Sequence, residues 1–299
     1  MAVTPPEAPS PDAAGQSVGY RVEDGVAVIE LRRPSAGNAL DAALRSGLLA
    51  SVRRVAGDAD GERVRAVLLT AQGRNFCVGQ DLKEHAEALE RDPESAFAVV
   101  RAEYNPLVEA LHALPVPVVA AVEGACVGAG LGLALCADVR VASDGARFAT
   151  AFTGIGLAAD SGLSLSLTRA VGPSYAALLM LLGDHLDAGV AQELGLAHLV
   201  VPDGQAAAEG LALARRLAAG PTAAYGEVKA LLRHAASGAG LSAVLEREAA
   251  AQERLGATED HRGAVRAFLA KEKPSFGGPL SKGHRTEGRQ AEGRRTEGR

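Results

Sequence analysis

The amino-acid sequence predicts an α/β fold in which a sheet and helices lie in layers, followed by a helical C-terminal region. Short runs of β-branched residues alternate with helical periodicity before Pro173, and the pattern after Pro173 is helical almost throughout. Hydrophobic residues make up 47% of the 299 residues, so the chain can bury a sizeable core. Aromatic residues make up only 3%, and we therefore expect a core of Ala, Leu and Val.

Predicted elements alternate over the first half of the chain. Short apolar runs bounded by turn residues are typical of buried strands. Between the first two runs, Leu44, Leu48, Val52 and Val55 recur at helical spacing. These patterns predict strands over residues 26–31, 64–70, 118–124 and 138–143, and helices over residues 41–55 and 131–137.

The last third of the chain is predicted to be helical around one short strand at residues 198–201. Helices are expected to begin at Pro221 and Leu241, and a last helix is expected over residues 259–270. No linker long enough to separate independent domains interrupts this pattern. We therefore expect one α/β core over residues 18–202 and a C-terminal helical region over residues 203–276.

The two ends of the chain lack core-forming patterns. Residues 1–17 contain four prolines and two acidic residues, but neither the basic nor the apolar segment of a signal peptide. Residues 277–299 contain three Glu-Gly-Arg units that end at Arg289, Arg294 and Arg299. Such composition cannot bury a core, so we expect a disordered leader and a disordered charged tail. A partner-binding role for the tail stays open.

Composition argues against several classes of function. The formal net charge of −5 provides no field that would gather nucleic acid or an anionic membrane. No apolar run approaches the roughly 20 residues of a membrane helix. Cys77, Cys126 and Cys136 are not in metal-ligand spacing, so we expect buried, reduced thiols and no metal site. The sequence thus predicts a cytoplasmic protein that binds neither nucleic acid nor a membrane.

Two glycine-rich segments are candidates for the chemistry. In residues 75–85, Asp81 and Glu84 form a capping-box pattern, which predicts a helix just after Asp81 and places the amide of Gln80 at its entrance. In residues 123–138 a strand runs into glycines and then into a helix. Amides at a helix N-terminus stabilise negative charge, so these loops could supply the two N–H donors of an oxyanion hole. The alternative is that the glycines only form tight turns.

Consecutive blocks of the sequence resemble the crotonase (enoyl-CoA hydratase/isomerase) superfamily in the same order. They include VLLTAQGRNFCVGQDL, PVPVVAAVEGACVGAGLGLALCADVRVAS and ARFATAFTGIGLAADSG, and the resemblance covers residues 20–276. It implies a spiral of repeated ββα units with a C-terminal helical trimerisation region, assembled as trimers or dimers of trimers. Leucines expected to meet a neighbouring copy are Leu211, Leu213, Leu217, Leu231, Leu232, Leu241 and Leu245.

The resemblance also implies acyl-CoA thioesters as substrates, with no cofactor beyond the coenzyme A that the substrate carries. The thioester oxygen would be held by the backbone N–H groups of Gln80 and Ala129. Alanine is tolerable in this Gly-Ala-Gly sequence if its φ is negative. Groups near the CoA phosphates fall at Lys271 and Lys273, although solvated surface lysines are commoner. Residues expected to line the substrate site are Val78, Gly79, Asp81, Leu82, Lys83, Gly128 and Phe152.

The acid–base positions favour isomerisation. The two glutamates with which hydratases of the superfamily hold a water fall at Gly132 and Phe152, so both carboxylates are missing. Asp160, in the segment GLAADSG, instead resembles the epoxyphenylacetyl-CoA isomerase branch. One carboxylate is enough to move a proton between carbons, and apolar neighbours would raise its pKa toward that of a useful base. We expect Asp160 to be the proton shuttle of an isomerase that shifts a double bond or opens a ring epoxide.

Alternatives within the superfamily stay open on the sequence alone. Asp160 is also a favoured N-cap for a helix over residues 161–171. The protein could be a hydratase, or a catalytically silent homologue that binds acyl-CoA. A dehalogenase of this superfamily would require a histidine where Asn105 falls.

A dehydrogenase is the alternative from another class. Residues 124–130 fit a GxxxGxG pattern, and residues Tyr225 to Lys229 fit a YxxxK pattern. In short-chain dehydrogenases the glycine motif opens the domain at its first strand. Here more than a hundred residues with strands of their own precede it, which argues against this alternative.

Overall fold

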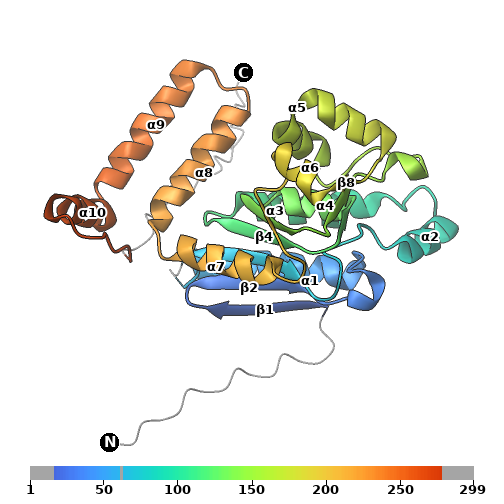
Figure 1. Ribbon diagram of the computed structural model, residues 1–299. Coiled ribbons are helices and arrows are strands. Elements are labelled where there is room, and N and C mark those ends of the chain that lie inside the picture. Colours follow the sequence, from blue (N-terminus) through green and yellow to red (C-terminus); the bar gives the residue numbers. More distant parts are fainter. Residues whose placement is uncertain (1–16, 61–62, 278–299) are drawn as a thin grey trace, which may run out of the picture.

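The fold is a six-stranded sheet with helices on both faces and a helical extension at the C-terminal end (Figure 1). The computed structural model describes residues 17–60 and 63–277. Apart from Ser17 and Gly277, the predicted leader and charged tail lie outside the described residues.

The main sheet is almost entirely parallel. Its order is β1 (Val18–Glu23), β2 (Val26–Leu31), β3 (Ala66–Ala71), β4 (Val118–Val122), β6 (Val139–Ser143) and β9 (Leu199–Val201). β1 pairs antiparallel with β2, and the other neighbours pair in parallel. Most residues of β2, β3 and β4 are buried whichever face they occupy. These strands therefore appear in the sequence as continuous apolar runs without alternation.

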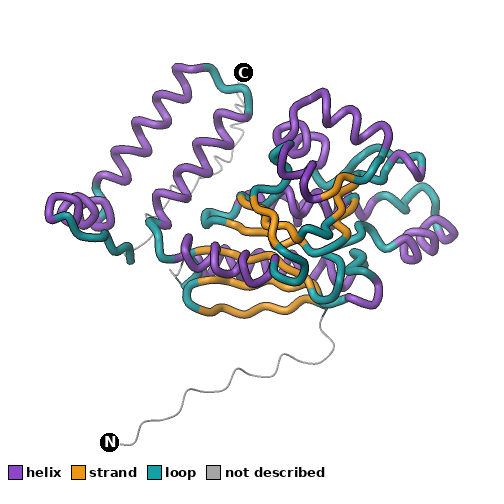
Figure 2. Tube along the Cα trace, viewed as in Figure 1, coloured by secondary structure: helices purple, strands orange, loops and turns teal. Residues whose placement is uncertain are grey.

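Helices cover both faces of this sheet (Figure 2). On one face, α7 (Ala206–Ala218) packs Ala206, Ala214 and Ala218 against alternate residues of the strands, such as Val28 and Leu68. On the other face, α1 (Ala42–Asp60) and α3 (Asn105–Ala113) enclose the larger core. The remaining helices are α2 (Leu82–Arg91), α4 (Ala129–Leu135), α5 (Leu163–Leu182), α6 (Ala188–Glu193), α8 (Thr222–Ala236), α9 (Leu241–Gly256) and α10 (Glu259–Ala270).

A second, smaller sheet is built by turns that leave the main one. It contains β5 (Ala125–Val127), β7 (Arg147–Ala149) and β8 (Leu186–Asp187), in that order. The chain passes from β4 to β5 through Gly124, whose φ is +55° and where a Cβ would collide with the carbonyl oxygen of Arg74. Only glycine fits such a turn. β4-β5-α4 and β6-β7-α5 are successive ββα units, as predicted.

Most predicted elements are confirmed. β2, β3, β4, β6 and β9 lie within two residues of the predicted strands, and the helices expected near Pro221, at Leu241 and over residues 259–270 are α8, α9 and α10. The helix predicted over residues 131–137 begins earlier, at Ala129, because the chain turns at Gly128 (φ 57°, ψ −124°). The short strands β5, β7 and β8 have two or three residues each, which is too few for a periodic signal.

Helix α5 corrects one expectation. Its 20 residues are long and apolar enough, by length and composition, to cross a membrane, so the statement that no apolar run approaches this length is wrong. The helix is kinked at Gly172, just before Pro173, and it buries Leu163 and Leu167 in the core beside α4. A single helix that meets this criterion is weak evidence of a membrane span, because helices of soluble proteins meet it too.

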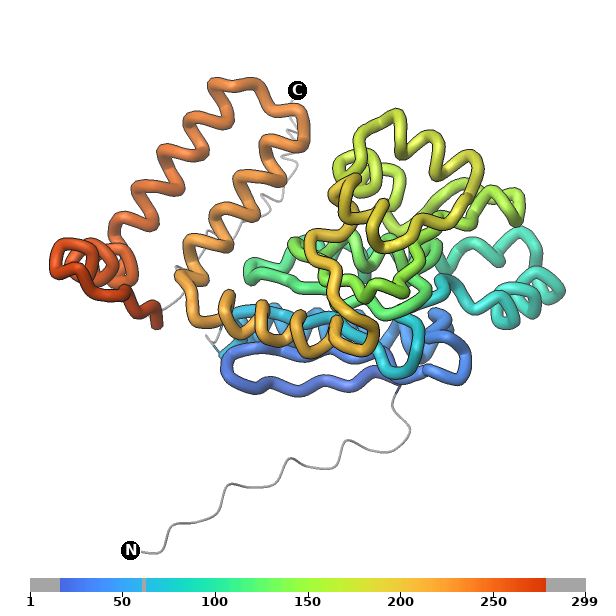
Figure 3. The backbone as a smooth tube through the Cα atoms, in the orientation of Figure 1, coloured from blue at the N-terminus to red at the C-terminus, as the bar shows by residue number. Residues whose placement is uncertain are grey.

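The C-terminal helices extend away from the sheet (Figure 3). α8 is attached to the core by Lys229, whose Nζ donates to the Val116 carbonyl oxygen at 2.8 Å and contacts Asp138 Oδ2 at 2.6 Å. On α8 and α9, Leu232, Leu241 and Leu245 are exposed, as the expectation of a neighbouring copy requires. Three of the other leucines, Leu211, Leu213 and Leu217, are partly buried against the protein's own sheet from α7, so their apolar surface already has a partner within the chain.

Candidate active site

The two glycine-rich loops lie against each other. Residues 76–78 run alongside β5: Phe76 N donates to Glu123 O at 2.7 Å, and Val127 N donates to Cys77 O at 2.9 Å. A Cβ built on Gly79 would lie 3.6 Å from the nitrogen of Ala129. This pairing brings the two predicted oxyanion loops together.

The backbone around Gln80 points its N–H away from its neighbouring strand. Leu40 N donates to Gly79 O at 2.8 Å, and Leu40 O accepts from Asp81 N at 3.3 Å. In such a parallel bridge, the peptide N–H of the residue between the two bonds faces the opposite side. Among the described residues, the Gln80 N–H has no hydrogen-bond partner. It is therefore free to donate to a ligand.

The Ala129 N–H is free for a different reason. Ala129 is the first residue of α4, and an N–H in the first turn of a helix has no partner within the helix. It donates to no other group among the described residues. Ala129 is not one of the residues with positive φ, so the condition for alanine at this place is met. Gly130 behind it is required, because a Cβ there would lie 2.8 Å from the Cβ of Cys77.

Charged side chains hold the first loop in place. Asp81 caps α2 by accepting from Lys83 N at 3.0 Å and Glu84 N at 3.3 Å, and it forms an ion pair with Arg33 at 2.8 Å. Of the predicted capping box, only the hydrogen bonds accepted by Asp81 are present. The Glu84 carboxylate instead accepts from Ala42 N and from the buried Arg45, both on α1. These contacts tie α1 to the start of α2.

A cavity of about 700 Å³ opens in front of both amides. Among the residues that the structure describes, Asp160 supplies the one carboxylate that lines it. Of the predicted lining residues, Val78, Gly79, Gln80, Leu82, Gly128, Ala129 and Phe152 do line it. Asp81 and Lys83 do not: Asp81 is occupied in capping α2, and Lys83 is exposed. Lining residues that the sequence does not reveal come from turns of the chain, namely Phe97, Val100, Arg101, Ile155 and Leu157.

Asp160 is half-buried and is not a helix cap. The N-cap of α5 is Gly162, and the Asp160 carboxylate accepts a hydrogen bond from the Ser161 hydroxyl at 2.8 Å. Burial raises the pKa of Asp160 above its ordinary value, and the Ser161 hydrogen bond partly offsets this effect. The capping alternative is therefore wrong, and a carboxylate with a raised pKa faces the cavity that holds the two free amides.

Comparison with known proteins shows the family. The model of the enoyl-CoA hydratase/isomerase family matches residues 21–279. The chain belongs to this family. A "Probable enoyl-CoA hydratase" of Rhodobacter capsulatus is 43% identical over 263 residues, 88% of this chain and 98% of the relative. The 1,2-epoxyphenylacetyl-CoA isomerase of Escherichia coli is 38% identical over 258 residues, 86% of this chain and 97% of the relative.

Solved structures show that this family member has the crotonase fold. An enoyl-CoA hydratase/isomerase structure from Mycobacterium abscessus superimposes with a TM-score of 0.85 at 57% identity. The match covers 87% of this chain and 99% of that one. The predicted fold class is therefore confirmed.

Two positions match the hydratase glutamates, residues 132 and 152. At residue 132 there is no room for a carboxylate side chain. A Cβ built on Gly132 would lie 2.7 Å from the Cβ and 3.0 Å from the carbonyl oxygen of Ser161. Ser161 thus occupies the space into which a side chain at residue 132 would extend. Phe152 presents its ring to the cavity near Gly128. In this family member the chain around Ser161 must move before a glutamate fits at residue 132.

Other candidate residues lie elsewhere. Lys271 caps the end of α10, and neither it nor Lys273 lines the acyl cavity of its own chain. Lys229, from the dehydrogenase-like pattern, is engaged with Asp138. His85 is a buried residue that the sequence did not single out: its Nδ1 lies 3.3 Å from Gln80 Nε2, and its ring packs edge-on against Phe97.

Proposed function

We propose that the protein is an acyl-CoA isomerase in which Asp160 moves one proton and the amides of Gln80 and Ala129 hold the thioester oxygen. The observation that carries the proposal is a single half-buried carboxylate in the cavity in front of two unpaired N–H groups. The amides supply electrostatic stabilisation, and the carboxylate supplies general base catalysis. Coenzyme A enters as part of the substrate, and the proposal requires no other cofactor.

The reaction proceeds through a thioester enolate. Asp160 takes a proton from the carbon next to the thioester carbonyl, the C–H bond breaks, and its electron pair delocalises to the carbonyl oxygen. The negative charge develops on the oxygen between the Gln80 and Ala129 N–H groups, where fixed dipoles stabilise it. The protonated Asp160 then returns the proton to a different carbon. The double bond shifts, and no atom is gained or lost. With a ring epoxide next to the enolate, the electron pair forms a new C=C bond as the adjacent C–O bond breaks, and the alkoxide oxygen takes the proton back from Asp160.

Hydration is the second candidate, because the R. capsulatus relative bears the name of a hydratase. A hydratase must activate a water and deliver its oxygen to carbon, for which the family resemblance implies two glutamates. Gly132 and Phe152 occupy those positions here. Asp160 alone would have to serve as both acid and base. A catalytically silent acyl-CoA-binding protein has no use for a carboxylate in an apolar cavity wall.

The test is a panel of 2-enoyl-, 3-enoyl- and ring-epoxide CoA thioesters analysed by mass spectrometry. Isomerisation leaves the product mass unchanged, whereas hydration adds the mass of one water. In heavy water, the isomerase should also exchange a substrate proton, and Asp160→Asn should not. A water-adduct product from the wild-type enzyme would establish the hydratase, and binding without any turnover would establish the silent homologue.

Assembly and compartment complete the proposal. We propose a trimer or a dimer of trimers, supported by the exposed Leu241 and Leu245 of α9. In such an assembly Lys271 and Lys273 would approach the CoA phosphates bound to a neighbouring copy. A cytoplasmic location is supported by Cys77 and Cys126, which are buried free thiols on adjacent strands.

A further inference from the structure

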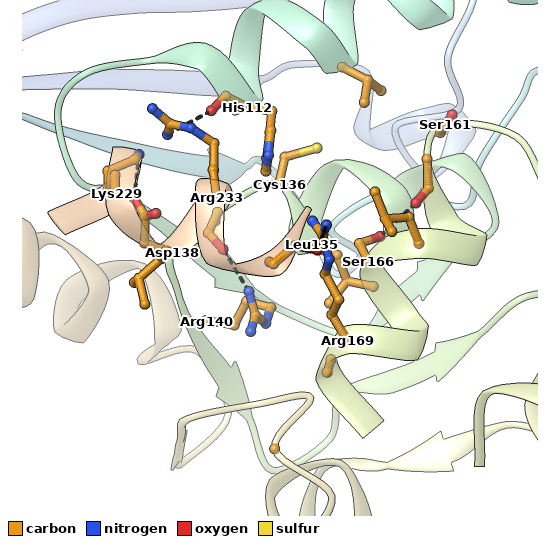
Figure 4. Close-up of a pocket in the computed structure, with 18 of the residues that line it drawn as sticks. His112, Leu135, Cys136, Asp138, Arg140, Ser161, Ser166, Arg169, Lys229 and Arg233 are labelled. Atoms are coloured by element: carbon orange, nitrogen blue, oxygen red, sulfur yellow. Dashed lines mark hydrogen bonds and ion pairs between the residues drawn. The ribbon is translucent and has the colours of Figure 1, made fainter. Parts of the chain in front are cut away.

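A second cavity lies beyond the turn that carries Asp160 (Figure 4). Its volume is about 740 Å³, and α3, α5, α8 and the segment between α4 and β6 enclose it. Figure 4 shows Lys229 and Asp138 on one side of this cavity and Ser161 and Ser166 on the other. No residue lines both this cavity and the acyl cavity. Asp160 faces the acyl cavity, whereas its neighbours Ser161 and Gly162 face this one.

The charges that line the second cavity are unbalanced. Four cationic side chains line it, Arg140, Arg169, Arg233 and Lys229, against one carboxylate, that of Asp138. Asp138 is already paired with Lys229 at 2.6 Å. Three arginines therefore face the cavity without a carboxylate partner among the described residues. Like charges crowded at a partly buried site are unfavourable unless an anion neutralises them.

Two of the three arginines have donors to spare. Arg140 already has a partner at each of its three nitrogens: Nε donates to Leu196 O at 2.6 Å, Nη1 donates to Ala137 O at 2.7 Å, and Nη2 lies 3.5 Å from His198 Nε2. Burial lowers the pKa of Arg140 to about 10. Arg169 donates to one carbonyl, that of Ala236, at 2.7 Å, and Arg233 donates to one carbonyl, that of His112, at 3.3 Å. Each guanidinium carries five N–H donors. Arg169 and Arg233 are thus able to bind an oxyanion.

The rest of the lining is apolar. Side chains of Val108, Leu135, Leu165 and Leu232 contribute to it, and Leu165 and Leu232 are exposed. Arginine forks match the geometry of carboxylate and phosphate, and apolar walls favour a hydrocarbon body. We propose that this cavity binds an organic anion with one carboxylate or phosphate head, held by Arg169 and Arg233, and an apolar body. The proposal does not depend on the reaction at Asp160.

The experiment measures the binding of octanoate to the full-length protein by titration calorimetry, with 1-octanol as the uncharged comparison. Octanoate should bind and octanol should bind at least about tenfold more weakly, because only the anion gains charge-assisted hydrogen bonds. Arg169→Ala and Arg233→Ala should each weaken octanoate binding about tenfold or more. Octyl phosphate in place of octanoate distinguishes the two head groups, and stronger binding of either supports the site.

The matched control is Arg216→Ala, an exposed arginine on α7 outside both cavities, which should leave the affinity unchanged. Saturated octanoyl-CoA should not displace octanoate, because the two ligands occupy different cavities. Displacement would mean that octanoate sits in the acyl cavity and would overturn the proposal. Equal affinities of the wild type and both arginine variants, or no binding of octanoate and octyl phosphate, would overturn it as well. Loss of turnover with intact anion binding would count against the proposed reaction alone.

Discussion

Asp160 and Ser161 are adjacent residues of one turn, and their side chains point in different directions. Ser161 has φ 52° and Gly162 has φ 68°, so two successive residues adopt the left-handed region. A non-glycine residue is uncommon in this region, and it persists where surrounding contacts hold it. The turn directs Asp160 toward the acyl cavity and packs Ser161 against Gly132. The turn thus sets two features of the site: Asp160, the proposed base, faces the acyl cavity, and Ser161 fills the space beside Gly132.

The pH profile of turnover should report the pKa of Asp160. The base must be ionised, and burial raises its pKa above the ordinary 3.8. We therefore expect kcat/KM to decline as the pH falls through this raised pKa, with the midpoint above 3.8. Steady-state kinetics measured from acidic to neutral pH tests this decline of kcat/KM. A flat profile down to pH values below the ordinary aspartate pKa would contradict the role.

Asp160→Asn should lose activity without losing stability. General acid–base catalysis contributes roughly a hundred- to ten-thousandfold, so turnover should fall at least about a hundredfold. A pKa that is raised in the folded state stabilises the fold below the unfolded pKa, and this contribution disappears as the pH rises through the folded pKa. At neutral pH the ionised Asp160 therefore destabilises the fold. At pH 7 the Asp160→Asn variant should unfold at a temperature equal to or higher than that of the wild type. The difference between the two unfolding temperatures should become smaller as the pH is lowered.

Ala129→Pro tests the second oxyanion donor. Proline is well accepted at the first position of a helix, where the missing N–H has no helical partner, so the fold should survive. Losing one oxyanion donor costs about 2.7–4 kcal/mol, roughly a hundred- to thousandfold in rate. Ala129→Gly keeps the N–H and serves as the matched control. A Pro variant with a folded circular dichroism spectrum and normal turnover would remove Ala129 from the site.

At the scale of elements, a partly buried ion pair helps to hold α8 against the core. Lys229 on α8 reaches the turn before β6, where Asp138 Oδ2 also accepts from Val118 N at 2.7 Å. The side chain of Lys229 is 9% exposed and that of Asp138 is 34% exposed, so the pair lies between a buried and a surface ion pair. Its loss leaves a carboxylate with one fewer partner next to the sheet.

Lys229→Met should lower the free energy of unfolding by about 1–3 kcal/mol, between the cost of breaking a surface pair and that of a buried one. Arg254→Ala removes the exposed pair with Glu227 on the same helical extension and should cost less than about 1 kcal/mol. Urea denaturation of both variants gives the comparison. Equal effects of the two substitutions would show that burial of Lys229 does not matter.

At the scale of the whole molecule, apolar side chains are exposed over the helices that leave the sheet. Leu181 at the end of α5, Leu241 on α9, and Phe268 and Leu269 on α10 are all more than 70% exposed. Phe268 and Leu269 are neighbours on α10, and exposed apolar groups that lie together are typical of an interface. In the proposed assembly, neighbouring copies of the chain would cover these side chains.

Light scattering at micromolar concentration should give the mass of a trimer or hexamer. Phe268→Glu combined with Leu269→Glu should shift the mass toward the monomer, because two charges would be buried in the interface without partners. Leu89→Glu, on α2, is the matched exposed control and should leave the mass unchanged. A monomeric mass for the wild type would contradict the proposed assembly.

The sequence by itself predicted the element types through local periodicity and turn residues, because both depend on neighbours in the chain. The resemblance of its motifs, in their order, implied the ββα units and the candidate oxyanion loops. Tertiary structure alone decided which side Gln80 N–H faces, through the bonds of Leu40, and that Ser161 fills the space beside Gly132. It also assembled the arginines of the second cavity from three elements. These features depend on contacts between residues tens of positions apart, which periodicity does not encode.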